Sequence, residues 1–76
     1  MKNDTVQRRF KIMLKELGLS QKEFSDQTGI QESDVSYYIN GHRHPSAMAL
    51  IKIANATHVS PSWILGFGSD EIMERM

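Results

Sequence analysis

Residues 19–41 read LSQKEFSDQTGIQESDVSYYING, and this stretch decides the fold. Ser20 and Glu23 stand at the spacing of a capping box, in which both side chains accept hydrogen bonds from the backbone at a helix start. Gly29 ends that helix, because the turn needs a positive φ that is costly for a residue with a β-carbon. A second helix follows at once and stops at Asn40-Gly41. The stretch therefore predicts two short helices joined across a tight turn.

The second of these helices has one apolar face and one polar face. Val35 and Tyr38 are three residues apart, so they share the face that packs onto the first helix. The side chain of Ser25 is small, so the two helices can approach closely where they cross. The opposite face presents hydrogen-bonding side chains on a helix whose size fits the major groove of DNA. These side chains are Gln31, Glu32, Ser33, Ser36 and Tyr37.

Further helices are predicted on both sides of this pair. The first helix begins at a cap near residues 3–5 and ends at Leu17. A fourth spans residues 46–58, with Ser46 as its N-cap, and a fifth spans residues 60–66. The apolar side chains assigned to the first and fifth helices are Val6, Phe10, Met13, Leu14, Leu17, Trp63, Ile64 and Leu65.

The expected architecture is all-α, a five-helix bundle formed by residues 1–68 as a single domain. Residues 69–76 are interpreted as a C-terminal tail or the start of a linker, forming one more amphipathic turn or fraying. Because the chain stops just past the bundle, it is either a short complete protein or the N-terminal piece of a larger one.

Charge is segregated along a chain whose net charge is zero. Residues 1–22 hold six Lys or Arg against two acidic residues, whereas residues 23–40 hold four acidic residues and no Lys or Arg. Residues 41–68 add Arg43 and Lys52. The sign of the local charge matters more than the sum when a surface must meet phosphates, so a nucleic-acid partner stays compatible with the composition.

Several classes of protein are not supported by the sequence. There is no cysteine, hence no disulfide framework and no thiolate metal site. His42 and His44 resemble a metal-binding pair, but no third ligand lies near them in sequence. No motif for an enzyme, a cofactor or a small-molecule ligand is present. Because neither a signal peptide nor a membrane span is evident, we expect a cytoplasmic protein.

The chain resembles the phage-repressor family, the Cro- and lambda-repressor-like (XRE-type) helix-turn-helix domains. The resemblance covers about residues 6–67 and is specific only as a set. It rests on Leu19-Ser20-Gln21, Gly29, Asn40-Gly41, Pro45-Ser46, Ile53-Ala54 and residues 59–66, which read VSPSWILG. It implies a lambda-repressor-like bundle whose third helix enters the major groove of double-stranded DNA, usually as two subunits on a palindromic operator.

The resemblance also implies roles for individual residues. Base edges are assigned to Gln31, Glu32, Ser33, Ser36 and Tyr37. Phosphates are assigned to the start of the second helix and to the end and following loop of the third, namely Gln21, Lys22, Asn40, His42, Arg43 and His44. Helix starts suit phosphates on physical grounds as well, and Arg43 is the permanent cation of that loop.

The sequence departs from the family pattern at three places. Leu14 and Ile39 stand where many members carry an arginine and a glutamate that pair, so we expect an apolar contact there. Thr28, Thr57 and His58 replace the usual apolar, apolar and glycine residues, which predicts a looser junction between the fourth and fifth helices. The third helix has no Lys or Arg, so it cannot itself make the commonest specific base contact, arginine to guanine.

Two functions from different classes remain at this stage. The preferred one is a sequence-specific transcriptional repressor that binds its operator as a homodimer. The alternative is a protein-interaction module on the same fold, an antitoxin or antirepressor-like binder, which the acidic third helix favours. The four residues Trp63, Ile64, Leu65 and Phe67 are more apolar surface than one short helix can bury. Trp63 is expected in the core, whereas for Ile64 and Phe67 an interface with a second subunit or a following domain is weighed equally with core packing. The basic stripe Arg8, Lys11 and Lys15 is either a solvated face or a phosphate track.

Overall fold

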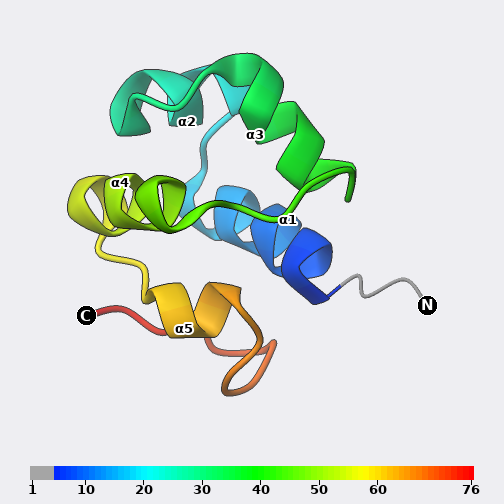
Figure 1. Ribbon diagram of the computed structural model, residues 1–76. Coiled ribbons are helices and arrows are strands. Elements are labelled where there is room, and N and C mark those ends of the chain that lie inside the picture. The colour runs from blue at the N-terminus through cyan, green and yellow to red at the C-terminus, as the bar shows by residue number, and fades with distance from the viewer. Residues whose placement is uncertain (1–4) are drawn as a thin grey trace.

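Helix α1 (Thr5–Leu17) contacts both α3 and α5 in the computed structural model, which describes residues 5–76 (Figure 1). The remaining helices are α2 (Gln21–Thr28), α3 (Glu32–Ile39), α4 (Ala47–Thr57) and α5 (Pro61–Ile64). The predicted all-α, five-helix fold is confirmed. The predicted caps at Asn3 and Asp4 lie outside the described residues.

Both ends of α2 have the predicted chemistry. The Ser20 hydroxyl accepts from the Glu23 N–H at 3.1 Å, and the Glu23 carboxylate accepts from the Ser20 N–H at 2.9 Å. Gly29 adopts the left-handed conformation with φ 78°, and its N–H donates to the Ser25 carbonyl. The Ser25 hydroxyl donates to the Ile30 carbonyl across the turn, so this small residue also ties the two helices together.

Three aromatic rings join α1 to the two helices of that turn. The Phe10 ring meets Phe24 of α2 edge-on, with centroids 6.2 Å apart, and Tyr38 of α3 at 5.2 Å. Phe10 and Phe24 are completely buried. Burying each such ring stabilises the fold by roughly 2–3 kcal/mol. The other side chains that are completely buried are Met13, Val35, Ile53, Val59, Trp63 and Ile64.

Arg9 of α1 is buried, with only 4% of its side chain exposed. No apolar pattern in the sequence predicts the burial of this charged residue. One guanidinium nitrogen donates to the carbonyls of Trp63 and Phe67 at 2.7 and 2.9 Å, and the other to the Gly68 carbonyl at 2.7 Å. The guanidinium also lies over the Trp63 ring, 4.8 Å from its centroid. Arg9 therefore holds the chain that leaves α5.

An ion pair continues this anchoring into the C-terminal tail. Both Arg8 and Arg9 donate to the Asp70 carboxylate, and these bonds hold the pKa of Asp70 below its ordinary value. The Trp63 indole N–H donates to the Ser69 carbonyl at 2.7 Å. The start of the tail is thus fixed to α1 and α5.

The end of the tail returns along the segment between α4 and α5. The Ser60 N–H donates to the Glu74 carbonyl at 2.8 Å, and the Met76 N–H donates to the His58 carbonyl at 2.7 Å. These bonds flank an isolated antiparallel bridge, and β pairing among residues 5–76 is confined to it. The expectation that residues 69–76 form a helical turn or fray is therefore wrong. Backbone pairing with residues 58–60 determines their path.

The C-termini of α2 and α4 end in the same way. At Thr28 and at Thr57 the hydroxyl donates to the carbonyl four residues earlier at 2.8 Å and accepts from the N–H two residues later at 3.2 Å. The residue after each threonine is left-handed, Gly29 in one case and His58, with φ 62°, in the other. The Thr57 hydroxyl therefore forms hydrogen bonds with two backbone groups at the junction of α4 and α5, which the sequence predicts to be loose. These bonds take the place of the contact that an apolar side chain would make there.

Other predicted positions are placed as follows. Leu14 and Ile39 are both buried in the common core, as expected for an apolar replacement of an ion pair. Leu65, one of the apolar side chains assigned to the fifth helix, is 47% exposed, because the chain leaves α5 at this residue. Across residues 5–76, no helix combines the length and the apolar character that crossing a bilayer requires.

We expect His58→Gly to stabilise the protein by about 1 kcal/mol, because glycine adopts the left-handed conformation without the cost that a β-carbon brings. The measurement is the urea midpoint of unfolding. Gly29→Ala is the matched control at the equivalent position of α2. A β-carbon at Gly29 would meet no atom within 4 Å, so the loss of stability expected there reports backbone conformation alone. A His58→Gly protein less stable than wild type would contradict the argument.

We expect Arg9→Met to lower the free energy of unfolding by about 2–4 kcal/mol, because three carbonyls lose the donor that satisfies them. Lys11→Met is the control, since Lys11 is an exposed cation on the same helix. Equal stabilities of the two variants in urea would show that the guanidinium contacts contribute little.

Candidate nucleic-acid interface

Helix α3 is held by its apolar face and exposes its polar face. Val35, Tyr38 and Ile39 are buried against α1 and α2. Of the five residues assigned to base edges, Ser36 is half-buried and the others are exposed: Gln31, Glu32, Ser33 and Tyr37. The structure therefore leaves the predicted base-reading side chains accessible on one short helix.

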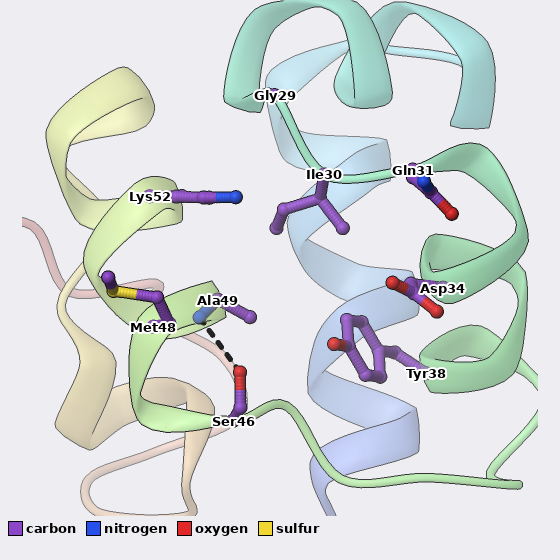
Figure 2. Close-up of a pocket in the computed structure, with 9 residues that line it drawn as sticks. All are labelled: Gly29, Ile30, Gln31, Asp34, Tyr38, Ser46, Met48, Ala49 and Lys52. Carbon is purple, nitrogen blue, oxygen red and sulfur yellow. Dashed lines mark hydrogen bonds between the residues drawn. The ribbon is translucent and has the colours of Figure 1, made fainter.

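The start of α3 is open on one flank. Gln31 is the N-cap residue, and its side chain makes no capping hydrogen bond. Together with Asp34 and Tyr38 it borders a hollow of about 390 Å³ whose far side is formed by α4, including Lys52, and by its N-cap residue Ser46 (Figure 2). Gln31 and Asp34 therefore line an open hollow beside α3, which α4 does not fill.

Tyr38 closes the floor of this hollow. Burial raises the pKa of its phenol, and the nearby Asp34 carboxylate raises it further. The phenol also interacts with the backbone of Ser46, at the start of α4. Tyr38 thus stays neutral and acts as a structural link between α3 and α4, whereas Tyr37, its neighbour in sequence, faces outward.

The end of α3 turns the loop back toward the helix. The Asn40 amide donates to the Ser36 hydroxyl at 3.2 Å, and the His42 N–H donates to the Tyr37 carbonyl at 2.9 Å. Gly41 has φ 77°, and a β-carbon there would come within 2.8 Å of the Gln7 side chain of α1. The turn therefore requires glycine for its conformation, whereas a β-carbon would displace only the end of the flexible Gln7 side chain.

The loop residues assigned to phosphates are all exposed, but Arg43 does not point away from the protein. Its guanidinium lies over the Tyr37 ring, 4.8 Å from the centroid, and one nitrogen is 3.7 Å from the Asp34 carboxylate. The His42 ring meets the same Tyr37 ring edge-on, with ring centroids 6.3 Å apart. Exposed contacts of these kinds are each worth at most about 1 kcal/mol, so they orient Arg43 without locking it.

At the start of α2, the assigned phosphate contacts are accessible. Gln21 and Lys22 are exposed, and Lys22 lies 3.7 Å from Asp26 one turn later. The Glu23 carboxylate accepts from Ser20, which lowers its pKa, so it stays negative at this helix start. Glu23 and Asp26 both weaken the positive field that Lys22 supplies.

The basic stripe of α1 is divided by the fold. Arg8 pairs with Asp70, whereas Lys11 and Lys15 are exposed. Of the two residues assigned to an interface, Ile64 is completely buried in the core of the chain and Phe67 is 70% exposed. The assignment of Ile64 to an interface is therefore wrong and the alternative, core packing, is found, because Trp63 and Ile64 both face inward from the single turn of α5.

One feature of this surface was not anticipated from the sequence. The contact between Arg43 and α3 joins a residue assigned to phosphate with a residue assigned to bases. Asp34 and Tyr37 are three residues apart on one helix, so the sequence indicates that they are neighbours. The sequence does not indicate that the loop brings Arg43 back to them, because this depends on the turn at Gly41.

In residues 5–76, His, Cys, Asp and Glu side chains form no group of three that could hold a metal ion.

Comparison with known proteins gives one match. A family model described as helix-turn-helix matches residues 10–64, which include α2, α3 and the loop that carries Arg43. No curated protein and no solved structure matches the chain.

Proposed function

The chain belongs to the helix-turn-helix family of the lambda-repressor-like (XRE) type and is a DNA-binding transcription regulator of that family; from that premise we propose that it is a repressor that binds a palindromic operator as a homodimer. The observation that carries the proposal is the outward polar face of α3 on a helix whose other face is fully packed. A rigidly held helix with exposed hydrogen-bonding side chains can read base edges with little loss of conformational freedom.

Base recognition is assigned to Gln31, Glu32, Ser33, Ser36 and Tyr37. A glutamine can bond adenine through two atoms, and a glutamate can accept from cytosine. Gln31 supports this role because its side chain makes no capping bond in the protein. Glu32 and Ser33 are exposed in the first turn of α3.

Phosphate contacts are assigned to two segments that flank α3 in sequence. The start of α2 contributes Gln21 and Lys22, and backbone N–H groups at such a start attract anions. The end of α3 and its loop contribute Asn40, His42 and His44, all of them exposed. Arg43, the remaining residue of the loop, is treated in the next section.

A second subunit adds the DNA affinity that a single domain lacks. Two acidic residues on α3 and few cations around it make the affinity of a single domain modest, because neutralising phosphates supplies most of the binding energy. The exposed Phe67 side chain, on the loop held by Arg9, is the proposed centre of the contact between subunits.

The rival function is a protein-interaction module on the same fold. The acidic residues Glu32 and Asp34 favour it, since they repel phosphates and would suit a basic partner surface. The two functions differ in their response to a pool of random DNA.

The deciding experiment is the selection of bound sequences from a random duplex pool at about 0.1 M salt, where screening is moderate. We expect enrichment of two inverted half-sites whose centres are about one helical turn apart. Enrichment of a single unpaired half-site would contradict the homodimer. No enrichment, even at low salt, would favour the protein-interaction module.

Gln31→Ala and Ser33→Ala should each weaken binding to the selected site by about 1–3 kcal/mol and relax the sequence preference. Gln27→Ala is the matched control, because Gln27 is an exposed glutamine on α2 outside the assigned surface. Titrations of selected and random DNA provide the measurement. Equal losses on both duplexes would remove these residues from base recognition.

A further inference from the structure

The recognition helix carries no cation of its own, yet the structure places one against it. Helix α3 contains Glu32 and Asp34 but no Lys or Arg. Arg43, four residues beyond the end of α3, lies over the ring of Tyr37 and next to Asp34. A residue from the loop thus joins the surface that is proposed to face the bases.

The stacked position leaves the hydrogen-bonding edge of the guanidinium available. The five N–H donors of arginine lie in the plane of the group, so a ring that covers one face does not occupy them. One nitrogen of Arg43 faces Asp34 at 3.7 Å, which is beyond ordinary hydrogen-bond length. The side chain of Arg43 remains 63% exposed, so the edge is open to a ligand.

We propose that Arg43 reads a guanine in the major groove, with Tyr37 as its platform and Asp34 as the residue that orients it, instead of contacting a phosphate. The inference rests on the proposed DNA-binding function and assigns within it the base contact that α3 cannot make. Arginine recognises guanine by donating to O6 and N7 from two nitrogens in one plane, and the contacts with Tyr37 and Asp34 favour a guanidinium position at the outward face of α3.

The contacts of Arg43 argue against a phosphate role. Its guanidinium lies against Tyr37 and Asp34, so a phosphate contact would have to compete with both of these contacts. His42 and His44, on either side of Arg43, are exposed, and of these His42 also contacts Tyr37. The loop is therefore held against the outward face of α3 by two residues that both contact Tyr37.

Asp34 has a definite role in this arrangement. Its carboxylate attracts the guanidinium to the flank of α3 and also repels phosphates. Replacing it with a neutral residue of the same shape should therefore separate the two effects. Asp34→Asn is expected to raise the affinity for random DNA while reducing the preference for guanine at the Arg43 position.

The test is a binding-site selection with the wild-type protein and with Arg43→Gln, followed by titration of duplexes that differ at one base pair. Arg43→Gln should lose the preference for guanine at one position of each half-site by about tenfold or more, while the preferences at the other positions persist. Tyr37→Ala, which removes the platform, should weaken the same position, whereas Tyr37→Phe keeps the ring and should retain it. Lys15→Gln on α1 is the charge-matched control and should leave the motif unchanged.

The outcomes separate this inference from the proposed function. If Arg43→Gln lowers binding to every sequence equally and reduces the salt slope by about one unit, Arg43 is a phosphate contact and the inference is overturned. A wild-type motif without any preferred guanine would overturn it as well. If the wild-type protein enriches no sequence, the proposed function fails and the inference fails with it.

Discussion

The packing of Phe10 against Phe24 and Tyr38 is the contact on which the presentation of α3 depends. One ring from each of the first three helices meets there, with centroid distances of 6.2 and 5.2 Å. Aromatic rings are large and have few rotamers, so their mutual geometry restricts the angle between the helices that carry them. Because Tyr38 is held in this cluster, Tyr37 is directed outward, to the surface that carries the proposed base contacts.

A chain without cysteine stabilises its C-terminal part by a buried cation. Arg9 satisfies one carbonyl of α5 and two that follow it, and Asp70 balances its charge together with that of Arg8. A buried guanidinium is unfavourable unless nearly every donor has an acceptor, and here the backbone supplies most of them. The exposed Phe67 is therefore presented by a loop whose backbone is fixed from within.

On the candidate interface, acidic side chains lie next to the basic ones and partly cancel their positive charge. Lys22 and Arg43, cations that would favour DNA, each lie beside an acidic residue, Asp26 and Asp34. Such exposed pairs are weak, but each reduces the attraction that a lone cation would exert on phosphates. Under the proposed function, selectivity would come from hydrogen bonds to bases and from symmetry more than from non-specific attraction.

The sequence by itself determined the helices, their caps and the outward face of α3. These features follow from local rules, since a capping box, a left-handed glycine and the spacing of Val35 and Tyr38 act within a few residues. It also indicated the family, through the set of motifs that the match over residues 10–64 confirms.

Tertiary structure alone decided the remaining features. The burial of Arg9 depends on carbonyls more than fifty residues away, and the path of residues 69–76 depends on pairing with residues 58–60. Ile64 is core and Phe67 is surface because α5 is a single turn. Arg43 meets Tyr37 because the loop folds back beyond Gly41. In each case the partner is distant in sequence or is set by the direction of a turn, and no local spacing encodes it.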